Sequence, residues 1–364
     1  MKAGWSIAKL QDVCELVNGR AYSKHELLAE GKYKVLRVGN FFTSDRWYYS
    51  DLELEDKKYC DYNDLLYAWS ASFGPRIWQG RKVIFHYHIW KVLPNYQLIT
   101  QKFLYHFFNW DMEKIKEDHG AGTTMLHVSK GSMDNRDISL PSISEQQRIV
   151  AILDEAFEQI AIARANTEKN LQNARTLFES HLQNVFTQRG EGFEAKTFDE
   201  VLVIKNGKDQ KPVEKVGGKY PIYGSAGNVM GWTDSYICDE QTTIIGRKGT
   251  INRPIFIETK FWNVDTAFGL AAKPNLNAKF LYFFCLSYDF SLHNRGTTIP
   301  SLVKTDLLNI KISVPSLTIQ EHLVEKFSAL HNETQRLESL YQRKLTMLDE
   351  LKKSLLHKAF AGEL

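Results

Sequence analysis

The segment Gly246-Arg247-Lys248-Gly249, followed by Asn252 and Arg253, has the residue types that most directly suggest a chemistry in this sequence. Paired glycines let a backbone approach a phosphate closely, while Arg and Lys side chains reach phosphate oxygens or the edge of a guanine. The segment therefore predicts contact with nucleic acid. A hairpin turn whose Arg and Lys are merely solvated is the alternative that the segment alone leaves open.

Other loops also combine basic, amide and aromatic side chains. The candidates for DNA contact in the N-terminal half are Arg37, Asn40, Arg76 and Lys82, and Lys208 and Tyr223 join them in the C-terminal half. Two Gly-Thr-Thr triplets, with Thr123 and Thr124 in one and Thr297 and Thr298 in the other, could donate hydroxyls to phosphates or simply cap the turn that follows.

Motifs for catalysis are poorly represented. The sequence has no G-x-x-x-x-G-K-[ST] loop, no H-E-x-x-H, no G-x-S-x-G and no Asp/Asn-Pro-Pro-Tyr/Phe tetrapeptide. Glu194-Ala195-Lys196 resembles the end of a nuclease E-x-K pattern, but isolated triplets of this kind are common by chance. The four cysteines stand singly, and the histidines form no spaced ligand set. We expect a non-catalytic chain with neither metal nor cofactor.

The charge is small and uneven. The net charge of +3 divides into +2 for residues 1–140, −1 for 141–190, +2 for 191–313 and 0 for the rest. This bias towards the predicted globular parts fits nucleic-acid contact without proving it. The lack of an eighteen-residue apolar run and of a charged-then-apolar leader at Met1 predicts a cytoplasmic protein with no membrane association.

An internal repeat must position these loops. The block from Leu140, LPSISEQQRIVAIL, returns from Val314 as VPSLTIQEHLVEKF. Lys102-Phe103-Leu104-Tyr105 recurs as Lys279-Phe280-Leu281-Tyr282, and Leu16-Val17-Asn18-Gly19 resembles Ile204-Lys205-Asn206-Gly207. The chain therefore predicts two copies of one unit, each ending in a long helix.

Apolar residues in steps of three and four indicate that the two long helices pair. The predicted seam residues are Ile149, Leu153, Ile160 and Leu177 in the first helix, and Leu323, Phe327, Leu330, Leu337, Leu348, Leu351 and Leu355 in the second. A short linker cannot return the chain along the first helix, so we expect an antiparallel coiled coil with pseudo-twofold symmetry. A coiled coil that merely dimerises the chain is the alternative.

The predicted fold is α+β, with two α/β domains separated by the two antiparallel helices. The boundaries we expect are 1–140 for the first domain, 141–188 for the first helix, 191–313 for the second domain and 314–364 for the second helix.

The sequence from Trp5 to Gly19, the paired blocks GTTMLHVSKGSMDNRDISLPSISEQQRIV and GTTIPSLVKTDLLNIKISVPSLTIQEHLV, and the closing KAFAGEL together resemble the specificity subunit of type I restriction-modification enzymes. The resemblance covers the full chain. Ile319 stands where the first copy has Glu145, and the second unit has no counterpart of Trp5.

The resemblance implies that each globular domain is a target-recognition domain for one half of a bipartite double-stranded DNA sequence, with the helices setting the spacer. It also implies that the helices dock two methyltransferase (modification) subunits and that restriction subunits join them. S-adenosylmethionine, ATP and magnesium would belong to those partners. We expect bases to be contacted by Arg247, Lys248, Asn252 and Arg253 and by residues among Arg37, Asn40, Arg76 and Lys82, and phosphates by the four threonines.

Two rival functions stay open at this point: a coiled-coil adaptor that joins two protein-binding domains without DNA, and a self-contained nuclease.

Overall fold

A computed structural model of the protein describes residues 4–70, 73–119, 128–187 and 192–364. The chain divides into two compact units. Unit 1 consists of Met1–Asn166 with Lys344–Leu364, and unit 2 consists of Thr167–Arg343. Among the described residues, no helix combines the length and apolarity needed to cross a membrane.

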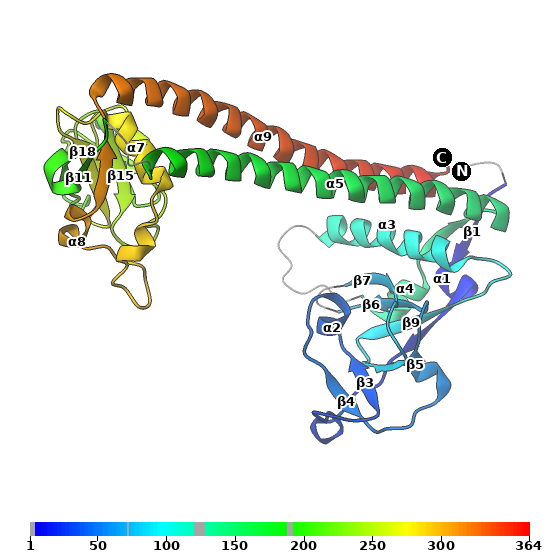
Figure 1. The fold of residues 1–364 in the computed structure, drawn as a ribbon. Coiled ribbons are helices and arrows are strands. Elements are labelled where there is room, and N and C mark those ends of the chain that lie inside the picture. The colour runs from blue at the N-terminus through cyan, green and yellow to red at the C-terminus, as the bar shows by residue number, and fades with distance from the viewer. Residues whose placement is uncertain (1–3, 71–72, 120–127, 188–191) are drawn as a thin grey trace. The chain divides into compact units, whose positions relative to one another are not determined.

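Unit 1 combines short strands with helices (Figure 1). Its strands are β1 (Ser6–Lys9), β2 (Cys14–Asn18), β3 (Tyr33–Leu36), β4 (Tyr48–Ser50), β5 (Tyr59–Cys60), β6 (Leu65–Ala68), β7 (Gly74–Ile77), β8 (Val83–Phe85), β9 (Ile89–Pro94) and β10 (Asp137–Leu140). Its helices are α1 (Leu10–Val13), α2 (Val38–Phe42), α3 (Gln101–His119), α4 (Lys130–Asp134) and the first part of α5 (Ile143–Phe186), with 3-10 turns at Lys24–Glu26 and Asp56–Lys58.

Unit 2 has a corresponding set of elements. Its strands are β11 (Glu194–Thr197), β12 (Leu202–Asn206), β13 (Tyr220–Tyr223), β14 (Val229–Thr233), β15 (Thr242–Gly246), β16 (Ile255–Ile257), β17 (Trp262–Asn263), β18 (Ala267–Ala272) and β19 (Lys311–Val314). Its helices are α6 (Phe198–Val201), α7 (Ala278–Ser287), α8 (Lys304–Leu308) and the first part of α9 (Leu317–Ala361), with a 3-10 turn at Phe290–His293.

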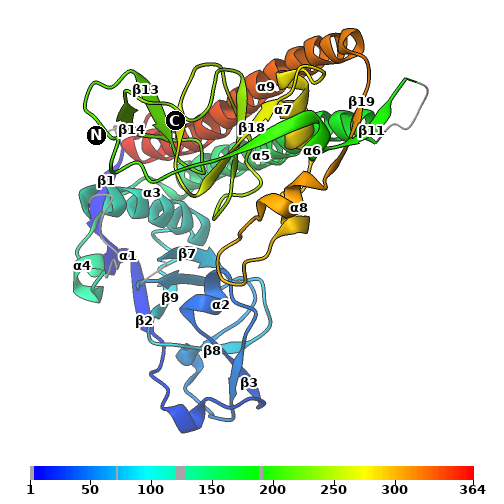
Figure 2. The same cartoon turned by 90° about the vertical axis from the view of Figure 1, so that its left-hand side faces the viewer.

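Most strands of the two units pair in the same order, except that the sheet β4-β3-β8-β5 of unit 1 has one strand, β5, more than β14-β13-β17 of unit 2. β1 pairs with β10 as β11 pairs with β19, and the sheet β2-β9-β6-β7 of unit 1, seen in Figure 2, has the counterpart β12-β18-β15-β16 in unit 2. β3 pairs with β4 antiparallel and with β8 parallel, just as β13 pairs with β14 and β17. The internal repeat read from the sequence is therefore a repeat of topology.

Gly19 and Gly207 explain why Asn-Gly recurs after β2 and β12. A Cβ on Gly19 would lie 2.3 Å from the carbonyl oxygen of His86, and one on Gly207 would lie 1.8 Å from that of Val264. Because the obstacle is backbone in both units, no side chain can move aside. Only glycine fits where the strand leaves the sheet.

Aromatic side chains join each globular part to the long helices. Phe360 of α9 packs on Phe103 and Phe107 of α3, with ring centroids 5.2 and 5.8 Å apart. Phe186, the equivalent residue of α5, packs in the same way on Phe280 and Phe284 of α7, at 5.0 and 5.4 Å. In each unit the end of one long helix therefore closes a core that also contains the start of the other.

The two long helices run antiparallel within each unit. In unit 1, Arg164 pairs with Asp349 at 2.5 Å, and Arg148 donates to the carbonyl oxygen of Leu364 at 2.6 Å. In unit 2, Arg175 pairs with Glu338 at 2.7 Å, and the ring of His181 lies 5.8 Å from that of Phe327. Residue numbers rise along α5 as they fall along α9. The predicted α+β class, with two α/β units, two long antiparallel helices and an internal repeat, is confirmed.

The predicted seam coincides only partly with the buried stripe of these helices. Ile149, Leu153 and Phe327 are fully buried, and Ile160, Leu323, Leu330, Leu337, Leu348 and Leu355 are partly buried. Leu177 and Leu351, which occupy equivalent positions of the repeat, are 64% and 47% exposed. The structure instead buries Phe178 in α5 and Leu356 in α9, each one position after a predicted seam residue.

This shift has a geometric cause. The prediction used a heptad repeat, which keeps a 3.5-residue period, whereas a straight helix has 3.6 residues per turn and drifts by about 20° per heptad. The buried residues Gln320, Phe327 and Thr334 of α9 follow steps of seven, but Thr334, Leu345 and Leu356 follow steps of eleven, as do Thr167 and Phe178 of α5. Steps of eleven average about 3.7 residues per turn, close to the period of a straight helix. The buried stripe of these helices therefore combines heptad steps with steps of eleven.

Candidate nucleic-acid interface

The Gly246–Gly249 segment is a tight turn at the end of β15. Gly249 has a positive φ of 81°, and a Cβ on Gly246 would lie 2.0 Å from the carbonyl oxygen of Thr250. The turn thus explains both glycines by backbone geometry. The turn therefore places Arg247 and Lys248 at a fixed position directly after β15.

Arg247 is half-buried and held in place. Its backbone N–H donates to Thr266 O at 2.8 Å, and its Nη1 donates to Asp265 O at 3.3 Å. The guanidinium lies 5.7 Å from the ring centre of Phe268, within the range of a cation–π contact. A side chain fixed in this way can offer its remaining N–H groups to a base edge. Lys248 beside it is exposed.

The loop with Thr297 and Thr298 is tied to this turn. Gly249 N donates to Pro300 O at 2.9 Å, and Leu302 N donates to Arg247 O at 2.8 Å. Both threonines are exposed. The structure therefore brings the predicted phosphate-binding loop and the predicted base-contacting turn onto one surface of unit 2.

The side chain of Asn252 stabilises the fold through hydrogen bonds, whereas that of Arg253 does not. The Asn252 amide donates to Asp289 Oδ1 at 2.6 Å and accepts from Phe290 N at 2.7 Å. Both ends of the amide thus anchor the 3-10 turn that begins at Phe290. Arg253 is exposed and, within the described part of the chain, forms no hydrogen bond or ion pair.

The other two candidates in unit 2 lie apart from this turn. Lys208 is exposed, and its backbone is anchored by Trp262, whose Nε1 donates to Lys208 O at 3.1 Å. Tyr223 is half-buried, edge-on to Phe261 at 5.6 Å, and lines a separate cavity.

In unit 1, Arg37 and Asn40 border a hollow of about 330 Å³ together with Tyr48, His86 and His88. Arg37 is exposed and lies 5.2 Å from the ring centre of Tyr48. Asn40 closes its own loop, since its amide donates to Ser44 O at 3.0 Å and Arg46 O at 2.8 Å. Burial, reinforced by the charges of His88 and Arg37, lowers the pKa of His86 to about 4.

Arg76 is near this hollow and Lys82 is further along the same unit. Arg76 donates to the carbonyl oxygen of Phe41 and lies over the rings of Phe41 and Phe42 of α2. Lys82 is exposed, with its ammonium 4.3 Å from the ring centre of Tyr59. Thr123 and Thr124 lie outside the described residues.

Trp69 was not among the candidates drawn from the sequence, yet it occupies in unit 1 the place that Arg247 has in unit 2. Trp69 N donates to His88 O at 3.1 Å and its Nε1 donates to Tyr87 O at 2.8 Å, as Arg247 donates to Thr266 and Asp265. Its ring stacks on Trp90 at 5.8 Å, as Arg247 lies over Phe268.

Strand register supports this equivalence independently. Trp90 pairs with Asn18 and Tyr67, and Phe268 pairs with Asn206 and Ile245. Tyr67 and Ile245 each stand two residues before the position in question. Ala68-Trp69-Ser70 and Gly246-Arg247-Lys248 share no residue, so the equivalence is visible only through the ladder.

A duplicated α+β protein with basic and aromatic surfaces at equivalent strand ends has the architecture expected of a two-domain DNA-recognition protein. Residues 2–173 and 190–345 match the family described as type I restriction modification DNA specificity domain. The chain therefore belongs to this family, as the sequence predicted.

Individual relatives are similar along much of the chain. A putative type I restriction enzyme specificity subunit of Haemophilus influenzae is 29% identical over 167 residues, 44% of this chain and 41% of that protein. The EcoDI specificity subunit of Escherichia coli is 22% identical, with 73% of this chain and 71% of that protein aligned. The MjaVIII specificity subunit of Methanocaldococcus jannaschii is 21% identical, with 83% of this chain and 79% of that protein aligned. The chain thus spans less than half of the first relative and over two thirds of the other two.

Solved structures show the same fold. One, described as concerning complex assembly and conformational transition of the type I R-M system, has a TM-score of 0.83 at 17% identity, covering 100% of this chain and 99% of that one. The HsdS subunit from Thermoanaerobacter tengcongensis has a TM-score of 0.59 at 16% identity, covering 100% and 98%.

Proposed function

We propose that each unit of this specificity subunit recognises one half of a bipartite double-stranded DNA target. The observation that carries the proposal is the Trp69–Arg247 equivalence. One backbone position, held by the same hydrogen bonds in both units, presents an indole in one and a guanidinium in the other. An arginine suits the acceptors of guanine, whereas an aromatic ring suits apolar contact such as with a thymine methyl group. The same backbone position carrying different side chains in the two units suits a DNA target whose two halves differ in sequence.

The helices α5 and α9 set the spacer and dock two methyltransferase subunits in this proposal. Exposed leucines support it, since Leu177 and Leu351 are 64% and 47% exposed and occupy equivalent positions of the repeat. Exposed apolar residues at equivalent positions of the two helices fit one partner contact repeated in each unit. Restriction subunits would join this core, and the complex would act on DNA in the cytoplasm.

The chain itself contributes no catalysis in this proposal. Methyl transfer and cleavage, with S-adenosylmethionine, ATP and magnesium, would belong to the partner subunits. Bases would be contacted by Arg247, Lys248 and Arg253 in unit 2. In unit 1 the contacts would come from Trp69, Arg37 and Arg76. Asn40 and Lys82 would shape or flank this surface of unit 1. Lys208, Tyr223 and Asn252 would do the same for the surface of unit 2. Thr123, Thr124, Thr297 and Thr298 would hold phosphates.

A salt-dependent DNA-binding measurement on the chain with its methyltransferase partner tests the proposal. Phosphate contacts release counterions, so the logarithm of the affinity should fall steeply and linearly with the logarithm of the salt concentration. A selection from random DNA should return two short motifs at a fixed separation. A complex that assembles but binds DNA without any such motif would contradict the function proposed.

A further inference from the structure

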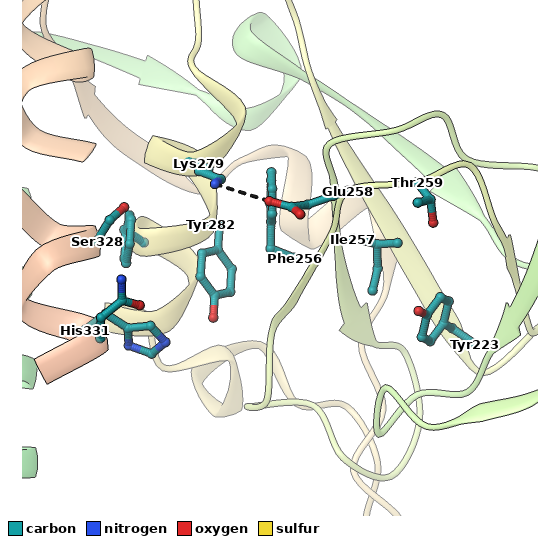
Figure 3. Close-up of a pocket in the computed structure, with 11 residues that line it drawn as sticks. Tyr223, Phe256, Ile257, Glu258, Thr259, Lys279, Tyr282, Ser328 and His331 are labelled. Atoms are coloured by element: carbon teal, nitrogen blue, oxygen red, sulfur yellow. Dashed lines mark ion pairs between the residues drawn. The ribbon is translucent and has the colours of Figure 1, made fainter. Parts of the chain in front are cut away.

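Unit 2 contains a cavity beside its long helix. The cavity measures about 430 Å³ and lies between the end of β16, α7 and α9. Figure 3 shows Ser328 and His331 of α9 on one side, Lys279 and Tyr282 of α7 beside them, and Glu258 reaching Lys279 from the strand end. The lining is polar on the helix side.

At the corresponding corner of unit 1, a carboxylate of the chain itself binds both a lysine and a histidine. Lys102 Nζ lies 2.6 Å from Asp154 Oδ2, and His106 Nε2 lies 2.8 Å from Asp154 Oδ1. Burial opposes ionisation of Asp154, but the hydrogen bonds from Lys102 and His106 hold the pKa of its carboxyl below the ordinary value. One carboxylate thus satisfies a lysine from α3 and an almost fully buried histidine.

The repeat shows what replaces this carboxylate in unit 2. In the alignment of the two long helices Asp154 corresponds to Ser328, and in that of α3 with α7 Lys102 corresponds to Lys279. The lysine is therefore kept while its internal acid is lost. Lys279 turns instead to Glu258 at 3.3 Å, where the two side chains are 47% and 72% exposed. An exposed pair of this kind contributes little free energy and is easily rearranged.

A histidine and a phenylalanine also exchange places between the units. His106 of α3 packs edge-on against Phe157 of α5, with ring centroids 5.5 Å apart. The corresponding residues of unit 2 are Phe283 of α7 and His331 of α9, again edge-on, at 6.1 Å. The histidine thus lies on α3 in unit 1 and on α9 in unit 2. In unit 2 it remains beside Ser328, which stands where unit 1 has Asp154.

His331 carries a hydrogen-bonding atom that the chain leaves unused. Gln335 Nε2 lies 2.9 Å from His331 Nε2, so the amide donates to that ring nitrogen and the proton is placed on Nδ1. Nδ1 is buried, and within the described residues it has no partner. Nδ1 of His106 has none there either, so a buried ring nitrogen without a partner is common to both units.

We propose that this cavity receives an acidic side chain of the methyltransferase subunit docked at unit 2, whose carboxylate takes the place that Asp154 occupies in unit 1. Lys279 would leave Glu258 for the incoming carboxylate, and Ser328 would donate to it. The inference rests on the proposed function for the identity of the partner. It makes the two docking positions chemically unequal, because only unit 2 needs an acid from its partner.

A substitution that places a carboxylate of the chain itself in the cavity tests the proposal. Full-length chain is titrated with purified methyltransferase subunit, and native mass spectrometry counts the subunits bound to each chain. Ser328→Asp should supply the acid internally and repel the partner's, so the second methyltransferase should bind about tenfold more weakly while the first is unchanged. Lys279→Gln, a change at an exposed position, should weaken the same step without adding charge.

Ala329→Asp is the matched control. It adds the same charge at the next position of α9, which is exposed and does not line the cavity, so the second affinity should stay close to that of wild type. If Ser328→Asp and Lys279→Gln both bind two methyltransferases with wild-type affinities, the inference is wrong and the proposed function is untouched. If wild-type chain binds no methyltransferase, the inference and the docking role proposed for the helices fail together.

Discussion

Gln146 and Gln320 make the same three hydrogen bonds in the two units. The Gln146 amide donates to Leu98 O and Pro141 O, and its Oε1 accepts from Thr100 N at 2.8 Å. The Gln320 amide donates to Asn275 O and Pro315 O, and its Oε1 accepts from Asn277 N at 2.7 Å. Both glutamines are fully buried. Each fixes the first turn of a long helix to the loop that starts α3 or α7.

Loss of this clamp should destabilise one unit at a time. Gln146→Ala leaves the Thr100 N–H and two carbonyl groups without their partner in a buried site, so the free energy of unfolding should fall by about 2–4 kcal/mol. Thermal unfolding followed by circular dichroism should show a lower Tm for Gln146→Ala and for Gln320→Ala. The control is Gln172→Ala at an exposed position of α5, which should leave Tm nearly unchanged.

The glycines that end β2 and β12 give a second stability test. Gly207→Ala would place a Cβ 1.8 Å from Val264 O, so the strand end must shift, and we expect a loss of about 3 kcal/mol or more. Gly131→Ala is the matched control, because no atom lies within 4 Å of its Cβ and it stands in α4. That control should be neutral or stabilising by up to about 1 kcal/mol. Equal Tm values for both variants would contradict the backbone clash.

The repeat, the long helices and their antiparallel pairing could be predicted because apolar spacing and local sequence similarity encode them. The Trp69–Arg247 equivalence could not, since loops of different length shift the register and the two side chains are unlike. The exposure of Leu177 and Leu351 was missed for a different reason, the drift between a heptad and a straight helix. The use of Asn252 as an anchor needed the position of Asp289, 37 residues away.

Arg247→Ala and Trp69→Ala should each alter one half of the DNA target. A base-contacting residue contributes about 1–3 kcal/mol of discrimination at its own position. Competition binding with DNA mutated in one half-site at a time should therefore show relaxed specificity in different halves for the two variants. Thr297→Ala, in the neighbouring loop proposed to hold phosphates, should instead weaken binding to all DNA alike, because a phosphate contact carries no sequence information. Equal weakening on all DNA by Arg247→Ala would remove it from the base-contacting residues.

His86 should make unit 1 sensitive to mild acid. Burial and the charges of His88 and Arg37 lower its folded-state pKa to about 4, below the ordinary value of 6.5. The unfolded chain therefore takes up the proton first, and the stability present above about pH 6.5 is lost as the pH falls towards 4. Urea unfolding from pH 7 to pH 4 should show a shallower decline for His86→Gln than for wild type. His25→Gln, at an exposed position, should retain the wild-type decline.

Shortening both long helices by one turn should change the spacer alone. We would delete four residues of α5 near Asn170 and four of α9 near Arg343, positions bracketed by the Arg164–Asp349 and Arg175–Glu338 pairs. Four helical residues span about 6 Å, which corresponds to roughly two base pairs of DNA. Selection from random DNA by the assembled complex should return the same two half-sites with a spacer shorter by one to two base pairs. The loops proposed to contact bases are untouched, so an altered half-site would contradict the idea that the helices set only the spacer. An unchanged spacer would show that partner subunits, not these helices, fix the distance between the half-sites.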